Sequence, residues 1–94
     1  MKTIHKHRLE AKDLVQTLKI PEDGKPLRAD YILQDRCIYM WVEVEADTII
    51  EQTSNERRFK AFLTGQGIPK DAIYVGSTVN HLKPEAYHVY ELVD

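Results

Sequence analysis

One segment of the chain reads Cys37-Ile38-Tyr39-Met40-Trp41-Val42-Glu43-Val44-Glu45 and alternates between two kinds of side chain. One kind is purely apolar and comprises Ile38, Met40, Val42 and Val44. The other kind is mixed and comprises Cys37, Tyr39, Trp41, Glu43 and Glu45. Such a period of two residues is typical of a half-buried β-strand. We therefore expect a strand over 37–45 whose apolar face lies in the core and whose other face is at least partly exposed.

Shorter alternating segments surround this one and are separated by turn signals. They cover residues 3–10, 14–20, 27–33, 57–63, 73–79 and 87–93. The connection at 34–36 is so short that the two strands it joins are expected to be antiparallel. Together the segments predict a single mainly β domain over residues 1–94. Its antiparallel sheet would have about six or seven strands, would form a small sandwich or partly open barrel, and would include at most one short helix.

Individual residues in these segments lead to more specific expectations. Pro21 and Gly24 mark a strong turn at 21–26, in which the glycine would supply a positive φ. Gly76 would mark a β-bulge or a close approach of two backbones. Alternation also assigns side chains to faces in two segments. Leu27, Ala29, Tyr31 and Leu33 would share one face, and Phe59, Ala61 and Leu63 would lie opposite Arg58, Lys60 and Phe62.

Two segments leave the choice between strand and helix open. Thr53 and Glu56 fit the capping box that would begin a helix over 54–64. The segment 9–18 also has apolar residues at helical spacing. Alternation fits strands in both places, and we expect the polar stretch 47–56 to form the most mobile loop.

Composition restricts the classes of function. The chain has 13 Lys and Arg residues and 15 Asp and Glu residues, and its net charge of −2 gives no electrostatic reason to expect nucleic acid. Its single cysteine, Cys37, cannot form an internal disulfide and is expected to be a buried structural thiol. The longest apolar run, 38–42, is too short to span a bilayer, and no apolar signal-peptide segment follows the basic start. We therefore expect a cytoplasmic protein that does not associate with membranes.

Residues with catalytic or metal-binding chemistry are present but not clustered. His5 and His7 would share a strand face, and His81 or His88 could supply a third metal ligand. No matching cysteine or carboxylate cluster accompanies them, and no nucleophilic triad or nucleophile elbow is visible. We expect no metal, no cofactor and no enzymatic activity.

Two groups of residues are candidates for binding instead. Tyr39 and Trp41 would be partly exposed, and side chains of these types are enriched at binding hot spots. They are the first candidates for a partner-binding surface, together with Arg58 and Lys60. The second group would bind an anion or another small ligand. It comprises Gly65, Gln66 and Gly67, whose backbone amides could approach a phosphate, and the side chains of Tyr74, His88 and Tyr90.

Three motifs occur in order along nearly the whole chain. They are Lys2-Thr3-Ile4-His5-Lys6, Thr64-Gly65-Gln66-Gly67-Ile68-Pro69 and His88-Val89-Tyr90-Glu91. With Trp41 and the segment 74–79, they resemble a family of small phage and prophage proteins of unknown function. The usual central loop of that family contains glycine, threonine, glycine, histidine and proline, whereas this chain has Gln66 and Ile68 in place of the threonine and the histidine. The resemblance implies a phage origin, a mostly β fold and an extended conformation over 57–63, but no known activity.

We therefore expect a non-catalytic phage accessory protein that acts in the cytoplasm of the bacterial host. It would engage or inhibit a host protein, such as a defence protein, through the face of a sheet. An alternative is a homo-oligomeric sponge that sequesters a nucleotide-type or phosphorylated signal molecule with Arg58, Lys60, the loop 65–67 and Tyr74 or Tyr90. A third alternative is a minor component of the virion or of its assembly.

Overall fold

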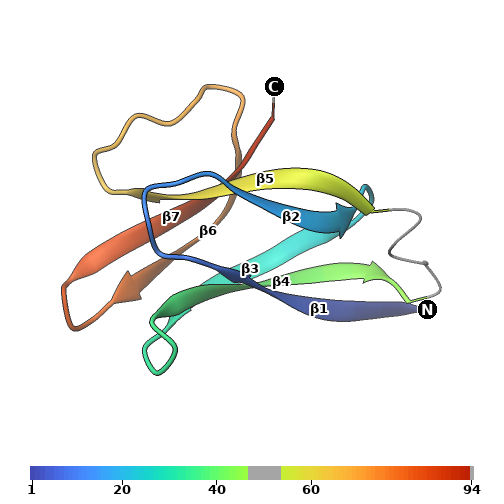
Figure 1. Ribbon diagram of the computed structural model, residues 1–94, viewed down its shortest axis with the longest axis horizontal. Helices are drawn as coiled ribbons and strands as arrows, with labels where there is room; N and C mark the ends of the chain where they lie inside the picture. Colours follow the sequence, from blue (N-terminus) through green and yellow to red (C-terminus); the bar gives the residue numbers. More distant parts are fainter. Residues whose placement is uncertain (47–53, 94) are drawn as a thin grey trace.

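Residues 1–46 and 54–93 of the chain are described by a computed structural model, shown in Figure 1. These residues form seven strands, all paired antiparallel, and no helix. The predicted fold class is therefore confirmed. Residues 47–53, which include most of the loop expected over 47–56, lie outside the described residues.

The strands belong to two sheets that together make a sandwich. In chain order they are β1 (Lys2–Leu9), β2 (Gln16–Pro21), β3 (Lys25–Ile32), β4 (Cys37–Glu45), β5 (Ser54–Leu63), β6 (Ile73–Asn80) and β7 (Glu85–Leu92). The three-stranded sheet has the order β1-β4-β3, and the four-stranded sheet has the order β2-β5-β7-β6. Within the described ranges the strands do not close into a barrel, because each sheet keeps two edge strands.

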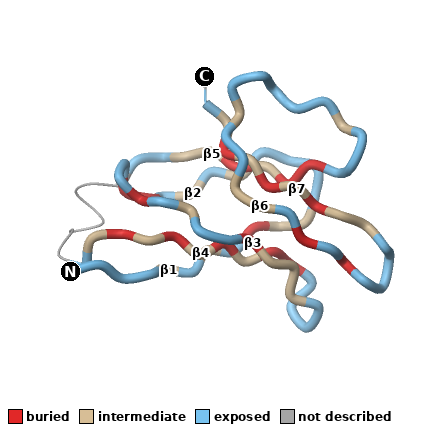
Figure 2. The backbone as a smooth tube through the Cα atoms, turned by 180° about the vertical axis from the view of Figure 1, so that it is seen from behind, coloured by how far each residue is buried: buried red, intermediate tan, exposed pale blue. Residues whose placement is uncertain are grey.

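The inner faces of the two sheets pack on each other and form the core (Figure 2). It comprises Leu9, Ala29, Ile38, Met40, Val42 and Val44 from the three-stranded sheet, and Ile20, Phe59, Ala61, Tyr87 and Val89 from the four-stranded sheet. The four apolar side chains that alternation assigned to the core face of β4 are all 0% to 3% exposed, which confirms that prediction. Burial of each large side chain of this kind stabilises the fold by roughly 1.5–3 kcal/mol. Cys37 is buried as expected and forms no disulfide.

Neither of the two helices that the sequence left open is present. β5 lies between β2 and β7, so neighbouring strands rather than helical turns satisfy its backbone hydrogen bonds. The segment 9–18 contains the end of β1, a connection and the start of β2. Leu14 and Val15, which the apolar face of a helix would have buried, are 43% and 45% exposed.

The turn after β2 contains Gly24 for a different reason from the one expected. A positive φ is found at Gly65 and at two non-glycine residues of the described chain, but not at Gly24. A Cβ atom on Gly24 would lie only 2.7 Å from Cγ2 of Ile20 and 2.9 Å from the carbonyl oxygen of Pro21. The glycine is needed because the turn folds closely onto β2, and the prediction of a positive φ was wrong.

Strands β3 and β6, which belong to different sheets, approach each other closely. The Tyr31 backbone N–H donates a hydrogen bond to Oγ1 of Thr78 over 2.8 Å. The register of β6 shifts between Tyr74 and Gly76, and a Cβ atom on Gly76 would meet the backbone nitrogen of Ala29 at 3.5 Å. Both expectations for Gly76, a bulge and a close approach, are therefore confirmed. The contact joins the two sheets along one side of the sandwich.

Candidate functional site

The outer face of the three-stranded sheet presents two aromatic side chains of its central strand to solvent. Tyr39 and Trp41 are both partly exposed, and their ring centroids lie 6.4 Å apart. The strand register places them in two rows across the sheet. These rows are Lys6–Trp41–Arg28 and Arg8–Tyr39–Asp30. Each aromatic side chain therefore lies between a side chain of β1 and a side chain of β3.

The Tyr39 ring is held in place on both sides. The ammonium group of Lys6 lies 4.4 Å from the ring centroid, and the phenol hydroxyl donates a hydrogen bond to Oδ2 of Asp35 over 2.6 Å. This hydrogen bond, with partial burial, raises the pKa of Tyr39 to about 12. These two contacts hold Tyr39 as a fixed neighbour of Trp41.

The same face carries an excess of positive charge. The paired residues that point outward include five cations, Lys2, Lys6, Arg8, Lys25 and Arg28, and three acids, Asp30, Glu43 and Glu45. This gives the face a formal charge of +2, whereas the whole chain has a net charge of −2. The outer face of the four-stranded sheet has the same formal charge by the same count, because it presents Lys19, Arg58 and Lys60 against Glu56. Both outer faces are therefore more basic than the chain as a whole.

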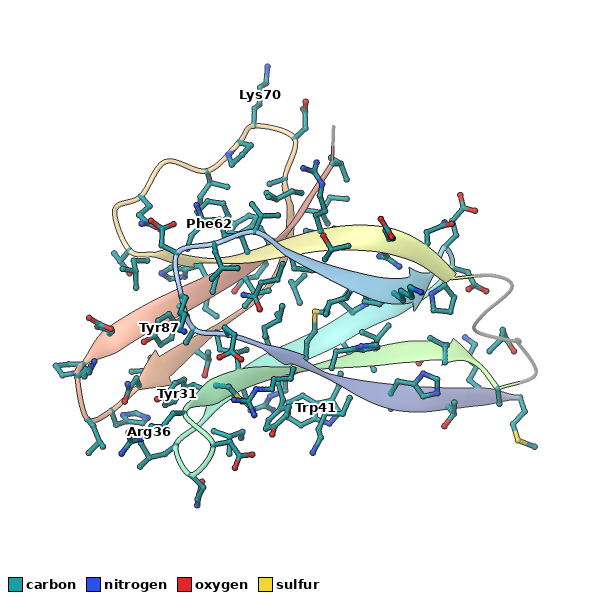
Figure 3. All side chains as sticks on the ribbon, in the orientation of Figure 1. Tyr31, Arg36, Trp41, Phe62, Lys70 and Tyr87 are labelled. Carbon is teal, nitrogen blue, oxygen red and sulfur yellow. The ribbon has the colours of Figure 1, made fainter. Side chains whose placement is uncertain are left out.

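The outer face of the four-stranded sheet holds the other residues singled out in the sequence. Arg58 and Lys60 alternate with the buried Phe59 and Ala61 on β5, so they point away from the core. The structure therefore separates the predicted partner-binding set, because the outer faces of a sandwich point in opposite directions. Figure 3 places Trp41 beside the strands of the three-stranded sheet and Phe62 beside those of the four-stranded sheet.

The second predicted set is brought together on this four-stranded face. Tyr74 and Tyr90 are direct neighbours across β6 and β7, with ring centroids 5.3 Å apart. The imidazole of His88 connects two hydroxyl groups, since Nδ1 lies 2.8 Å from Oγ of Ser77 and Nε2 lies 2.8 Å from Oγ1 of Thr64. The Ser77 hydroxyl is in turn 2.8 Å from the hydroxyl of Tyr74. Sequence reasoning missed Thr64 and Ser77. The pairing of β5 with β7 brings Thr64 to His88, and the pairing of β6 with β7 brings Ser77 to it.

The cations of this face already have partners. Lys60 forms an ion pair with Asp13 at 2.8 Å, and this bond lowers the pKa of the Asp13 carboxyl. The Lys60 ammonium group also lies 4.9 Å from the ring centroid of Phe62, which is only 3% exposed although it belongs to the outer face. A ligand that recruited Lys60 would have to displace Asp13.

Gly65 and Gly67 lie in the turn that follows β5, near this face. Gly65 adopts a φ of 93°, a left-handed conformation that favours glycine. The side-chain oxygen of Gln66 accepts a hydrogen bond from the backbone N–H of Leu63 over 2.9 Å. A Cβ atom on Gly67 would have nothing within 4 Å. The backbone N–H of Gln66 also donates to the carbonyl oxygen of Leu63 over 3.1 Å, so two amide donors of this turn are already used within the chain.

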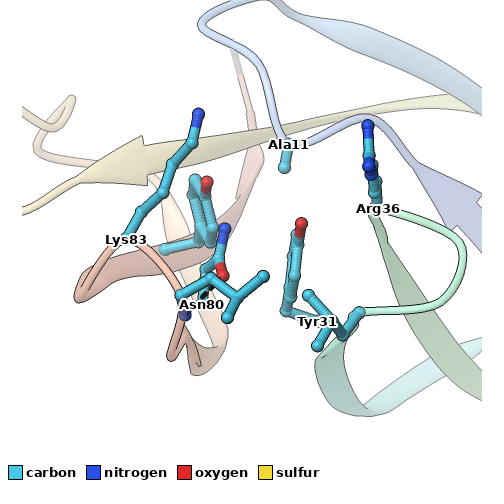
Figure 4. Close-up of a pocket in the computed structure, with 8 residues that line it drawn as sticks. Ala11, Tyr31, Arg36, Asn80 and Lys83 are labelled. Atoms are coloured by element: carbon cyan, nitrogen blue, oxygen red, sulfur yellow. Dashed lines mark hydrogen bonds between the residues drawn. The ribbon is translucent and has the colours of Figure 1, made fainter.

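A pocket that sequence reasoning did not anticipate opens at one end of the sandwich, between the β3–β4 and β6–β7 turns (Figure 4). We call it the end pocket. It has a volume of about 420 Å³, and its wall includes Ala11, Tyr31, Arg36, Asn80, Lys83 and Tyr87. The rings of Tyr31 and Tyr87 stack at a centroid distance of 5.7 Å and an angle of 23°. In Figure 4, Arg36 and Lys83 rise on opposite sides of Tyr31.

Comparison with known protein families identifies the chain at the family level. A family model described as a domain of unknown function, DUF7352, matches residues 1–94. The chain belongs to the DUF7352 family. No curated protein and no solved structure matches the chain. The description of the DUF7352 family names no activity.

The histidine pair of the DUF7352 domain lies on the inner face of β1, opposite Val42 and Met40 of β4. Burial, with a contribution from His5, lowers the pKa of His7, and Nε2 of His7 is buried without a hydrogen-bond partner. Within residues 1–46 and 54–93, no three residues of the His, Cys, Asp and Glu types gather closely enough to hold a metal ion. Over the same ranges, no helix has the length and apolar character needed to cross a bilayer.

Proposed function

We propose that this protein is a non-catalytic binding protein that engages an acidic protein surface with the outer face of its three-stranded sheet. The observation that carries this proposal is the position of Trp41. It is partly exposed and lies in one row with Lys6 and Arg28, and its indole N–H has no hydrogen-bond partner among the described residues. Tryptophan, tyrosine and arginine are the side chains that most often dominate the energy of protein interfaces.

The charge of this face indicates the chemistry of the partner. A surface with a formal charge of +2 on an acidic protein favours and orients an acidic partner. Its internal ion pairs, such as Lys2–Glu43 at 3.2 Å and Arg28–Asp30 at 2.7 Å, are solvent-exposed. Exposed pairs of this kind contribute only about 0–1 kcal/mol each, so carboxylates of a partner can replace the internal acids at little cost.

The outer face of the three-stranded sheet is rigid in the free protein, which favours binding. The side chains on the opposite side of β4 form the core, and the Tyr39 ring is fixed by Lys6 and Asp35. A surface that is already ordered in the free protein loses little conformational entropy when a partner binds. The two aromatic anchors are therefore pre-organised.

The resemblance of the motifs to small phage and prophage proteins supports a more specific version of this proposal. In that version the protein is a phage accessory protein in the cytoplasm of a bacterial host. Its acidic partner is a host protein, such as a component of a defence system, whose surface is blocked by the bound sheet. A protein that acts by occupying a surface needs anchors and charge complementarity rather than a catalytic centre.

The experiment is a pulldown from a lysate of the bacterial host with wild-type protein, Trp41→Ala and Tyr74→Ala. Tyr74 is the matched control, because it is a 57% exposed aromatic side chain on the other sheet. We expect wild type and Tyr74→Ala to retain one partner that Trp41→Ala loses. With the purified partner, Trp41→Ala should weaken binding more than about tenfold, and added salt should weaken the wild-type complex. Identical partner lists for all three proteins would overturn the proposal.

A second candidate function is the homo-oligomeric sponge for a phosphorylated signal molecule. It is favoured by the clustering of Tyr74, His88 and Tyr90 on one outer face, next to Thr64 at the start of the glycine loop. This face lies on the outside of a single chain, so a second copy would have to enclose the ligand. Native mass spectrometry of protein purified from host cells tests this directly. An oligomer with a retained ligand would support the sponge, and a ligand-free monomer would exclude it.

A further inference from the structure

We propose that the end pocket is a binding site for a small molecule that combines a planar ring with a phosphate group, of the nucleoside monophosphate class. The site is separate from both outer sheet faces, and its residues differ from those of the partner surface and of the sponge. The proposal rests on three features of the pocket wall, which are its free cations, its tyrosine and leucine side chains, and its rigid base.

The first feature is a pair of cations without acidic partners. Arg36 comes from the β3–β4 turn, and Lys83 comes from the β6–β7 turn. Neither side chain has a hydrogen bond or ion pair with any described residue, so no internal acid has to be displaced before a ligand binds. Each of these cations can form a charge-assisted hydrogen bond with a phosphate group at its own side of the pocket.

The second feature is the uncharged part of the wall. Tyr31 is partly exposed and has Tyr87 stacked behind it, so it presents an aromatic surface of fixed orientation. Each turn also brings a leucine to the rim, and Leu33 and Leu82 are 46% and 74% exposed. A planar ring that covered these side chains would remove apolar surface from water. The volume of about 420 Å³ lies within the range of roughly 300–1,000 Å³ that is usual for small-molecule pockets.

The third feature is the rigidity of the pocket base. Asn80 is 5% exposed, and its side-chain oxygen accepts a hydrogen bond from the backbone N–H of Leu82 over 3.1 Å. The backbone N–H of Tyr31 is held by Thr78 of the other sheet at 2.8 Å. The two turns are therefore fixed relative to each other before any ligand arrives, which lowers the entropic cost of binding.

The backbone of Arg36 provides an independent indication. Its φ of 51° lies in the left-handed region, where glycine or asparagine is the usual residue in a turn. A long charged side chain at such a position costs backbone energy, and strained positions of this kind cluster at ligand sites. A hydrogen bond from the guanidinium group to a ligand in the pocket would offset the energy of this strained backbone.

The test is a titration of isotope-labelled protein with nucleoside 5′-monophosphates, followed by backbone amide shifts in NMR spectra. Adenosine alone and inorganic phosphate alone are the two partial ligands. At millimolar concentration we expect at least one monophosphate to shift amides in the two turns, at 31–36 and 80–83, and to bind more tightly than either partial ligand. Preferential binding of phosphate alone or of adenosine alone would overturn the combined ligand class.

Three variants decide whether these residues form the site. Arg36→Gly removes a cation and relieves the strained φ, and Lys83→Met removes the second cation. Each should weaken monophosphate binding by about tenfold, the loss expected for one charge-assisted contact. Lys70→Met is the control, because Lys70 is exposed in the β5–β6 loop (Figure 3), and it should bind like wild type.

The outcomes separate this inference from the proposed function. Well-dispersed spectra of each variant will show that it is folded. No amide shifts at millimolar monophosphate, or equal binding by wild type, Arg36→Gly and Lys83→Met, would overturn the inference. Trp41→Ala should bind the monophosphate like wild type, since Trp41 is not part of the pocket wall. A failed titration would therefore leave the partner surface unaffected, and a failed pulldown would leave the pocket unaffected.

Discussion

Gly24 and Gly67 are residues of the same type in contrasting surroundings, and they allow a comparison at the scale of single atoms. An added Cβ at Gly24 would lie 2.7 Å from Cγ2 of Ile20 and 2.9 Å from the backbone oxygen of Pro21. Both distances are too short for a carbon atom, so the turn would have to shift. An added Cβ at Gly67 would meet nothing within 4 Å, and its φ is not in the left-handed region.

We predict that Gly24→Ala lowers the free energy of unfolding by about 1–3 kcal/mol, the usual cost of overpacking. Gly67→Ala should leave it unchanged or raise it by up to about 1 kcal/mol, because alanine restricts the unfolded chain. Urea titrations of both variants and wild type measure these differences as shifts of the unfolding midpoint. Equal midpoints for Gly24→Ala and Gly67→Ala would contradict the close approach at the first turn.

Single residues also show how far the sequence could predict the structure. The buried face of β4 was predictable because a period of two assigns every side chain to one of two faces. Phe62 was not, since alternation places it on an outer face, where Tyr90 and Lys60 pack against it. Leu27 was expected on the face of Ala29, but a register shift between Pro26 and Arg28 interrupts the alternation, and Leu27 is 42% exposed.

At the scale of strands, the ion pair between Arg57 and Glu91 connects β5 with β7. Arg57 also connects β5 with the end of β2 and with the turn that follows it. Arg57 of β5 donates two hydrogen bonds of 2.7 Å to the carboxylate of Glu91 on β7. It also donates to the carbonyl oxygens of Pro21 and Gly24, at 2.9 Å and 2.8 Å. The hydrogen bonds to Glu91 raise the pKa of Arg57. Both side chains are largely buried, with exposed fractions of 15% and 12%.

We predict that Arg57→Met lowers the free energy of unfolding by about 3 kcal/mol, because it leaves a largely buried carboxylate and two carbonyl groups without a donor. The double variant Arg57→Met/Glu91→Leu should recover part of this loss, since it removes the unpaired charge. Chemical denaturation of the two variants and wild type gives the measurement. A double variant less stable than Arg57→Met would show that the carboxylate is not the source of the loss.

Strand pairing also explains which parts of the candidate sites sequence reasoning could find. Tyr39 and Trp41 were identifiable because they share one strand. The neighbours of His88 depend on how β5 and β6 align with β7. The end pocket depends on two turns that lie almost fifty residues apart, at Arg36 and Lys83. Local periodicity carries no information about such alignments, because they are set by packing of the whole sandwich.

At the scale of the whole molecule, His7 couples stability to pH. Burial, together with His5, lowers the pKa of His7 in the folded state below its usual value near 6.5. The unfolded chain then binds a proton at a higher pH than the folded chain does. The stabilisation is fully present above the unfolded pKa and is lost as the pH falls through the folded pKa.

We predict that the melting temperature of wild type falls between about pH 7 and pH 5, and that His7→Gln flattens this decline. Thermal unfolding at several pH values in this window provides the measurement. His81→Gln is the control, since His81 is exposed in the β6–β7 turn and the variant should keep the wild-type slope. A decline that is the same in all three proteins would contradict the role of His7.

The interleaved order of the strands has a consequence for how the chain is made. β2 precedes both β3 and β4 in the sequence but pairs with β5 in the opposite sheet, so neither sheet comes from one continuous segment. A ribosome therefore has to release residues up to Phe59 before β2 can pair along its whole length with β5. Until then Ile20, which is fully buried in the folded protein, lacks the strand beside it, and exposed apolar side chains of this kind favour aggregation of an incomplete chain.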